Sequence, residues 1–449
     1  MDNNLFRKPK KVNEVDNKYQ FLGFTQNPFP SEPAVKPYST DSRVNGSIFL
    51  EKIREEEIKD FKKHIVNASN KIGLLMDYAA YKGRGIGKTA FLNHMKNSIN
   101  TDLGNNISNG DSVLYAVYVS PSADKQNRSL SDVAHSIFTS MHKEGLFLTV
   151  FCRLRALSGL LDDIIDETVN ESNYEDTIAN DNWLKEHGVD VQRVNSFVMD
   201  KLVEAGISDN VSSLFGGSYQ SYKLSLEDNK NEYFWKKTGL QYLFGNIEKL
   251  LKEALFTNCI ILLDEAEKMI QYQSSNERRA LCDDLRYYFI DGSCSNAIDG
   301  FFKIVLTIHP NSQELLMPHW AAAGLDRFCS LGGDISSENT IFFKPMSNDV
   351  MMINELAEIY LKESRIDPND NSINPFTQEA INYAMEKSDR IPGRFLRMLY
   401  LMIEKAVQNH WEVIDREKID VAWQENNKYY SVMSNAIDDA PLPETKIEL

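Results

Sequence analysis

The chain contains a glycine-rich segment, YKGRGIGKTAF (81–91), in which alternating glycines are followed by Lys88 and Thr89. Glycines let successive backbone N–H groups point at one anion, a lysine reaches terminal phosphates, and a threonine hydroxyl can bind Mg²⁺. The segment predicts a phosphate-binding loop, and the alternative is a flexible basic turn. The predicted binding residues are Gly83, Arg84, Gly85, Ile86, Gly87, Lys88, Thr89 and Ala90, with Thr89 also binding the metal ion.

One position departs from the usual phosphate-loop pattern. That pattern has a glycine five residues before Gly87, where this chain has Lys82. The missing glycine belongs at the strand exit, farthest from Lys88, where a residue with negative φ is tolerated. The stretch before the loop (71–81) is apolar enough for a buried strand, and the stretch after it (89–99) has apolar residues at helical spacing. A glycine loop between a strand and a helix is the context in which phosphate binding is expected.

A second group of candidate residues is the acid pair Asp264–Glu265, within NCIILLDEAEKM (258–269). The apolar run before the pair has the length and β-branched content of a buried strand. In a doubly wound sheet the carboxyl ends of the strands form one edge, where the phosphate loop also lies. We expect Asp264 to hold Mg²⁺ through water and Glu265 to orient or deprotonate an attacking water. The alternative is a pair of surface acids after a core strand.

The rest of the chain predicts an α/β protein with a helical C-terminal part. Short apolar runs predict further buried strands at 112–121, 300–310 and 340–345. Apolar residues at helical spacing predict helices at 129–145, 191–206, 231–256, 347–365, 376–388 and 391–410.

The order of these features resembles that of the AAA+ ATPases. KGRGIGKT is similar to their Walker A motif and IILLDE to their Walker B motif, and the likeness covers about 70–90 and 240–424. Further parallels are a sensor strand in VLTIHP, an arginine-finger segment in LDRF and a second sensor in PGRFLRML. The resemblance implies a P-loop NTPase sheet flanked by helices, a C-terminal α-helical lid, and ATP with Mg²⁺ as cofactors.

The resemblance also implies roles for further residues. Thr307 or His309 would sense the γ-phosphate, and both remain open. Arg394 would contact the ATP of its own subunit, and Arg327 would stabilise the transferred phosphoryl group on a neighbour. The alternatives are a surface Arg327 packed on Phe328 and an Arg394 in a structural ion pair. Because a finger arginine acts at a subunit boundary, we expect ATP to favour a ring or filament and hydrolysis to loosen it.

Two regions indicate which AAA+ ATPases the chain resembles and where it departs from them. Residues 21–61, with an NPF phrase, a Pro-rich loop and then a helix, look like the entry of the ExeA-type and TnsC-type ATPases. That likeness implies nucleotide-dependent oligomers that are often loaded on DNA. The chain departs from such relatives by a long stretch between its Walker motifs, which predicts a helical, partly acidic insertion at 151–235. Residues 161–190 carry ten carboxylates against one lysine, which favours a protein partner over nucleic acid; the alternative is a passive, solvated decoration.

These patterns divide the chain into six expected parts. They are an N-terminal arm and NPF loop (1–48), the first part of the base with Walker A (49–150), the insertion (151–235), the second part of the base with Walker B and the sensor strand (236–345), the helical lid (346–424) and a tail (425–449). No winged-helix domain is expected after the lid, so any DNA contact would come from core loops or from the basic arm at 7–11.

Composition limits the class of protein. A chain of 449 residues with 42% hydrophobic and 25% charged residues is long enough for two or three globular domains. No apolar run approaches the ~20 residues of a membrane span. The net charge of −16 argues against a general nucleic-acid coat. Scattered cysteines predict buried thiols in a reducing, cytoplasmic compartment, and they are Cys152, Cys259, Cys282, Cys294 and Cys329.

The predicted function is ATP binding and hydrolysis by an oligomer that acts as a switch or loader for a partner protein or DNA. A DNA-associated motor would show DNA-stimulated hydrolysis. A slow switch, as in signalling and antiviral-defence ATPases, would recruit an effector such as a nuclease through 151–235. A DEAD-type helicase, suggested by DEAE, is disfavoured because the region after residue 345 predicts a helical lid and not a second RecA-like domain.

Overall fold

The computed structural model describes residues 17–77, 85–101, 113–121, 128–165, 169, 173–207, 238–331, 338–425 and 428. The basic arm at 7–11 and the tail after residue 428 lie outside this range. The chain forms two compact units. Unit 1 comprises Met1–Glu55, Gly83–Ala90 and Lys344–Leu449, and unit 2 comprises Glu56–Lys82 and Phe91–Phe343. Among the described residues, no helix combines the length and apolarity needed to cross a bilayer.

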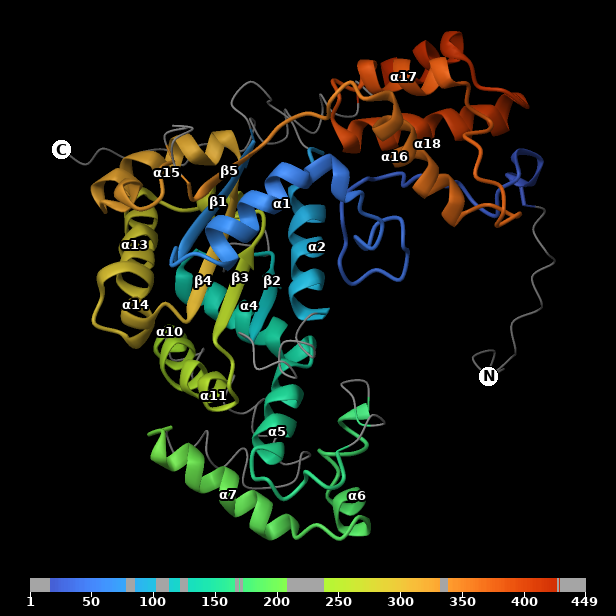
Figure 1. The fold of residues 1–449 in the computed structure, drawn as a ribbon. Coiled ribbons are helices and arrows are strands. Elements are labelled where there is room, and N and C mark those ends of the chain that lie inside the picture. The colour runs from blue at the N-terminus through green and yellow to red at the C-terminus, as the bar shows by residue number, and fades with distance from the viewer. Residues whose placement is uncertain are drawn as a thin grey trace, which may run out of the picture. The chain divides into compact units, whose positions relative to one another are not determined.

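Unit 2 is built on a five-stranded parallel sheet (Figure 1). Its strands lie in the order β2-β3-β4-β1-β5, and their bounds are Ile72–Asp77 (β1), Leu114–Val119 (β2), Asn258–Leu263 (β3), Phe302–Ile308 (β4) and Thr340–Phe343 (β5). Nearly all strand residues are buried, because both faces of a parallel sheet are covered by helices. The predicted strands are confirmed.

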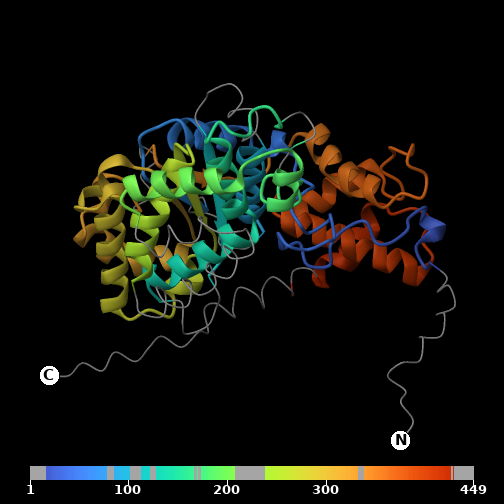
Figure 2. The ribbon, with the colours of Figure 1, turned by 90° about the horizontal axis from the view of Figure 1, so that it is seen from below.

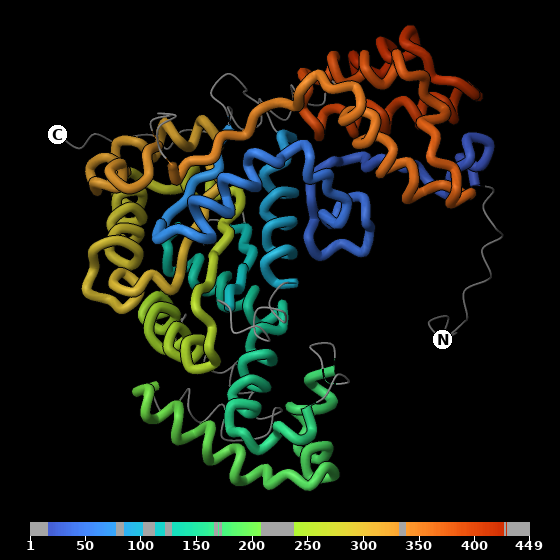
Figure 3. Tube along the Cα trace, in the orientation of Figure 1, coloured from blue at the N-terminus to red at the C-terminus, as the bar shows by residue number. Residues whose placement is uncertain are grey.

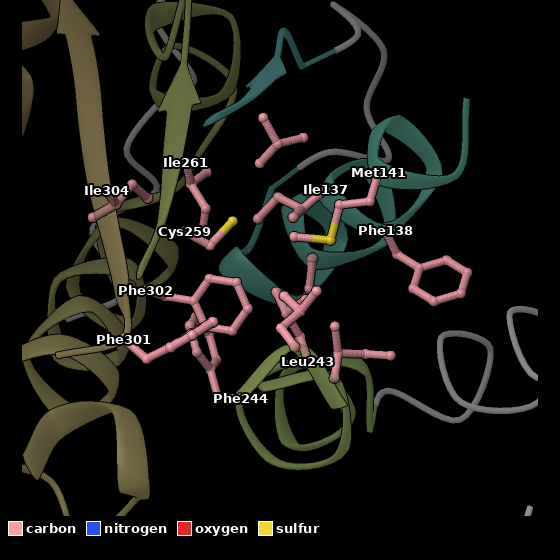
Figure 4. Close-up of a cluster of buried hydrophobic side chains, with 14 of the residues drawn as sticks. Ile137, Phe138, Met141, Leu243, Phe244, Cys259, Ile261, Phe301, Phe302 and Ile304 are labelled. Atoms are coloured by element: carbon pink, nitrogen blue, oxygen red, sulfur yellow. The ribbon is translucent and has the colours of Figure 1, made fainter. Parts of the chain in front are cut away.

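One face of the sheet carries the larger core. The helices that pack on it include α4 (Leu130–Lys143), α10 (Gly239–Gln241), the π-helical η6 (Tyr242–Ile247) and α11 (Glu248–Glu253). Figure 4 shows Phe244 of η6 beside Phe302 of β4, in a cluster that also contains Ile137 and Met141 of α4. The rings of Phe244 and Phe302 meet edge to face with centroids 5.4 Å apart. Each buried aromatic of this kind contributes about 1.5–3 kcal/mol to folding.

The opposite face is covered by a shorter layer. It consists of α1 (Glu55–Phe61), the π-helical η4 (Lys62–Val66) and α2 (Lys88–Thr101) from Phe91 onward. Phe91 meets Phe61 and Phe343 edge to face, at 5.6 and 5.1 Å between ring centroids. A Cβ at Gly73 of β1 would lie 2.4 Å from Ile65 Cδ1, so a side chain here would require the end of Ile65 to move. Helices on both faces confirm the predicted α/β class.

Unit 2 contains further helices besides those of these two layers. They are α12 (Glu267–Ile270), α13 (Ser275–Arg286), the π-helical η7 (Tyr287–Asp291), α14 (Ser295–Asp299), α15 (Pro310–Ala322) and the 3-10 turn η8 (Leu325–Arg327). All five cysteines are free thiols, and all but Cys294 are buried.

The described residues of the region predicted to be an insertion are largely helical and are tied together by a buried arginine. Its helices are α5 (Leu146–Ala156), α6 (Asp181–Glu186) and α7 (Val191–Glu204), and α7 lies across unit 2 when seen from below (Figure 2). Arg155 is 1% exposed and donates to Asp181 Oδ1 at 2.7 Å, to Ile178 O at 2.9 Å and to Asn195 Oδ1 at 3.1 Å. These partners offset the cost of burying a charge. One carboxylate of the acidic stretch is therefore structural.

Unit 1 combines an N-terminal segment with helices from the C-terminal part of the chain. Its helices are α16 (Val350–Glu363), α17 (Gln378–Lys387) and α18 (Pro392–Asn409), with the 3-10 turns η2 (Gln20–Leu22) and η3 (Glu51–Arg54). The blue N-terminal segment lies beside the red helices in Figure 3. On α18, Glu404 accepts hydrogen bonds from Lys18, Tyr19 and Asn27 at 2.9, 2.6 and 2.9 Å. The predicted C-terminal helices are confirmed, and the NPF segment packs on them through Phe29, which is fully buried.

Candidate nucleotide site

The carboxyl edge of the sheet in unit 2 holds a buried acid. Asp264, 1% exposed, directly follows β3. Its Oδ2 accepts a hydrogen bond from the Tyr118 hydroxyl at 2.8 Å. Its Oδ1 accepts from Thr307 Oγ1 at 2.7 Å and from the backbone N–H of Glu265 at 2.9 Å. Both carboxylate oxygens are thus oriented by donors on two neighbouring strands and on the chain that follows β3.

Strand register explains why these side chains meet. Val119 pairs with Leu263, and Leu263 pairs with Leu306. Side chains alternate between faces along a strand, so Tyr118, Asp264 and Thr307 all point to the face opposite the larger core. The sequence predicted the acid and the threonine at one edge. It did not single out Tyr118, although a polar group near the end of an alternating strand is a recognisable signal.

Glu265 lies next to this acid in an unusual backbone conformation. Its φ is +51°, in the left-handed region that non-glycine residues rarely adopt. Its carboxylate accepts a hydrogen bond from Ser120 Oγ at 3.0 Å and forms an ion pair with Lys268. The side chain is 36% exposed, so it is open to solvent while its neighbour Asp264 is not. Sequence reasoning missed Ser120 and Lys268; Ser120 directly follows β2, the same position that Asp264 has after β3.

The phosphate loop lies in unit 1 where it is described. Gly85 and Gly87 have φ of +104° and +103°, which a residue with a side chain would adopt only with strain. The loop leads into α2, which begins at Lys88. Thr89 and Ala90 follow in its first turn, and all three residues are half-buried. The first turn of a helix has unbonded N–H groups and a partial positive charge, which suits a phosphate. Gly83 and Arg84 lie outside the described residues.

The loop is held by contacts within unit 1. The N–H of Gly393 donates to Gly85 O at 2.8 Å, and Arg54 Nη2 donates to Ile86 O at 2.6 Å. Gly393 comes immediately before Arg394 on α18. Sequence reasoning identified neither contact, because each joins positions far apart in the chain.

Arg394 has an ion-pair partner in its own unit. Its Nη1 lies 2.6 Å from Asp389 Oδ2, and its side chain is 18% exposed. Asp389 and Arg390 precede α18 with φ of +54° and +58°, two consecutive left-handed residues without glycine. An ion pair at Arg394 was the alternative to a role as second sensor. Asp389 is 65% exposed, so solvent reaches the pair mainly from the side of this carboxylate.

The remaining predicted residues lie in unit 2. Thr307 is buried on β4, and His309 is the half-buried N-cap residue of α15. Arg327 is exposed in η8, followed by Phe328, which is 45% exposed. The positions of Arg327 and His309 are compatible with the predicted roles, and those roles remain predictions.

The residues present fit ATP and Mg²⁺. Glycines with positive φ and a helix N-terminus supply N–H donors for phosphates, and Lys88 supplies a cation. The oxygens of Asp264 already accept hydrogen bonds, which suits a carboxylate that holds a metal through water and not directly. Among the described residues, no cluster of three or more His, Cys, Asp or Glu could hold a metal by itself. A Mg²⁺ with several waters and phosphate oxygens as ligands needs no such cluster.

The parallel sheet with helices on both faces, the glycine loop that opens α2 and the acid after β3 define an α/β P-loop NTPase fold. No protein-family model matches the chain, and no curated protein matches it. Among solved structures the chain is similar to the ORC2 protein of Aeropyrum pernix, described in ADPNP-ADP complexes. The identity is 10%, the match covers 87% of this chain and 69% of that one, and the TM-score is 0.39. This likeness is too distant to carry a functional conclusion.

Proposed function

We propose that the chain is an AAA+ ATPase that binds Mg-ATP and hydrolyses it. The observation that supports this best is the loop in which Gly85 and Gly87 both have positive φ and lead into a helix at Lys88. The oriented acid after β3 supports it independently. The narrower likeness to the ExeA-type and TnsC-type branch is part of the proposal.

In the proposed mechanism the loop residues 83–90 bind the phosphates through backbone N–H groups, and Lys88 contacts the terminal ones. Thr89 and, through water, Asp264 would hold Mg²⁺, which would neutralise charge on the phosphates. Glu265 accepts a proton from the attacking water. The Ser120 hydrogen bond and the Lys268 ion pair are both made to Oε2 of Glu265, so Oε1 can accept this proton while both contacts remain.

Further residues complete the proposal. Thr307 or His309 senses the γ-phosphate. Arg394 binds the phosphates from its own subunit, and Arg327 acts on the ATP of a neighbour. Because Arg327 is exposed in η8, it is accessible to a second copy of the chain. Assembly into a ring or filament would then depend on bound ATP.

Replacement of Lys88 by Ala tests ATP binding. We expect a loss of about 10- to 100-fold in affinity, because hydrogen bonds from a charged donor are removed. Isothermal titration with Mg-ATP measures it, and Lys185→Ala on α6, an exposed lysine, is the matched control. Equal affinity in the wild type and Lys88→Ala would refute the proposal.

Replacement of Glu265 by Gln tests hydrolysis separately. The variant should bind ATP and lose turnover by about 10²-fold or more, because the proton acceptor is removed. Size-exclusion chromatography with ATP should show the assembled form trapped. Full turnover in Glu265→Gln would remove Glu265 from the mechanism while leaving ATP binding intact.

A second candidate is a slow ATP-driven switch that recruits an effector through residues 151–235. It is favoured by an insertion with its own packed helices and two exposed apolar side chains on α7, Phe197 (37% exposed) and Val203 (57%). Hydrolysis measured with and without double-stranded DNA separates the candidates. A DNA-associated motor or loader should be stimulated by DNA. A switch should hydrolyse slowly and independently of DNA.

A further inference from the structure

Two carbonyl groups of the phosphate loop are fixed by other parts of unit 1. Gly85 O accepts a hydrogen bond from the N–H of Gly393 at 2.8 Å, and Ile86 O accepts from Arg54 Nη2 at 2.6 Å. One donor precedes the loop in the chain and the other follows it by hundreds of residues. The loop is therefore held by both the N-terminal and the C-terminal segment of unit 1.

Because the peptide bond is planar, these two contacts also orient the N–H group that follows each carbonyl. In a planar trans peptide the C=O and the next N–H point in opposite directions. When Gly85 O faces Gly393, the N–H of Ile86 faces away from it. When Ile86 O faces Arg54, the N–H of Gly87 faces away in turn. The two contacts thus fix the directions of two successive N–H groups, that of Ile86 away from Gly393 and that of Gly87 away from Arg54.

Arg54 is placed to act as a rigid support. Its side chain is 3% exposed at the end of η3. Its second arm, Nη1, donates to Lys344 O at 2.7 Å. A planar guanidinium holds two acceptors in fixed geometry, which a lysine ammonium cannot reproduce. Ile86 O is therefore fixed relative to the backbone at Lys344, directly after β5 in the chain.

Gly393 provides the second support by close approach. A Cβ at this position would lie 2.8 Å from Gly85 Cα and 2.9 Å from Gly85 O. Real Cβ atoms do not approach backbone atoms so closely, so any side chain here must push α18 and the loop apart. The hydrogen bond from its N–H would lengthen or break as a result.

We propose that Arg54 is a positioning residue for nucleotide binding, and that with Gly393 it preorganises the N–H groups of Ile86 and Gly87 for the phosphates. The inference rests on the proposed ATP-binding function. Without these contacts, the loop loses its fixed carbonyls and must be ordered by the ligand at a cost in affinity. Nucleotide affinity is thereby set in part by the segment before α1 and by the start of α18.

The test measures Mg-ATP affinity and thermal unfolding without nucleotide for Arg54→Lys, Arg54→Met and Gly393→Ala. The matched control is Arg365→Lys. Arg365 is a buried arginine of unit 1 (8% exposed) whose Nη2 donates to Ser372 O and Asn374 O, away from the loop. We expect Arg54→Lys and Gly393→Ala to weaken ATP binding about tenfold, the size of one lost charged hydrogen bond. Arg365→Lys should lower the unfolding temperature and leave affinity unchanged.

Each outcome decides the inference. Wild-type affinity in Arg54→Lys overturns it and leaves the proposed function standing. Equal losses of affinity and unfolding temperature in Arg54→Lys and Arg365→Lys assign Arg54 a merely structural role. A wild-type protein that binds no Mg-ATP overturns the proposed function and this inference with it. If Arg54→Met fails to fold, the decision rests on Arg54→Lys, which keeps the charge.

Discussion

The hydroxyl of Thr307 donates a 2.7 Å hydrogen bond to Oδ1 of Asp264, so the polar residue of β4 supports the acid that follows β3. Thr307→Val keeps the shape of the side chain and removes the donor. We expect Mg-dependent ATP turnover to fall about 10- to 100-fold, as is usual when a partner of a metal-holding carboxylate is lost. Turnover is measured across a Mg²⁺ titration.

The same titration separates two roles for Thr307. If it acts through Asp264, half-saturation shifts to higher Mg²⁺; if it senses the γ-phosphate alone, maximal turnover falls without that shift. Thr149→Val on α5, where the hydroxyl donates to Gly145 O at 3.3 Å, is the matched control. Unchanged kinetics in Thr307→Val would exclude both roles.

The Asp389–Arg394 ion pair leads to a substitution that should strengthen ATP binding. Asn tolerates a positive φ, so Asp389→Asn preserves the turn before α18 while removing the charge that binds Arg394. If Arg394 binds phosphate, it no longer has to leave this partner, and ATP affinity should rise about two- to fivefold, the worth of an exposed ion pair. Glu379→Gln, which breaks the exposed pair with Arg416, is the control and should leave ATP affinity unchanged. Weaker binding in Asp389→Asn would contradict this prediction.

Lys303 on β4 leads to a stability prediction. Its buried Nζ donates to Ile65 O, Val66 O and Ala68 O at 2.8, 3.1 and 2.7 Å, and burial lowers its pKa. Lys303→Met would leave these carbonyls at the end of η4 without their donor and should lower the free energy of unfolding by about 2–4 kcal/mol. Urea unfolding measures it. An equally stable variant would show that water or the backbone replaces the lysine at no cost.

Asp284 on α13 predicts a pH dependence of stability. Burial, and to a smaller extent the charge of the neighbouring Asp283, together raise its pKa to about 6. The folded protein therefore holds this proton between about pH 4 and 6 while the unfolded chain releases it, so stability from this group falls as pH rises through that window. Asp284→Asn should match the wild type near pH 4 and be more stable at pH 7.5. Urea midpoints at both pH values measure the effect, and Asp60→Asn, exposed on α1, should not show it.

The sequence predicted the strands and most helices because these depend on local apolar patterns. Asp264 was placed at the edge of the phosphate loop because the strands of such a sheet end together, and Thr307 was singled out, with His309, by the resemblance to a sensor strand. The contact from Tyr118 required the register of three strands, which no single segment contains. Arg54 was missed because it acts on a loop about thirty residues away. Asp389 was missed because its position depends on two consecutive left-handed residues without glycine.

Glu404 lies on α18, and its carboxylate accepts hydrogen bonds from three residues near the start of the described chain. During synthesis the ribosome must therefore complete β1 to β5 and begin α18 before Lys18, Tyr19 and Asn27 can meet this carboxylate. The sheet, whose residues lie between these two segments, is able to fold while the N-terminal segment still waits for its acceptor. Unit 1 is in this sense completed after the sheet, although its first residues leave the ribosome before the strands do.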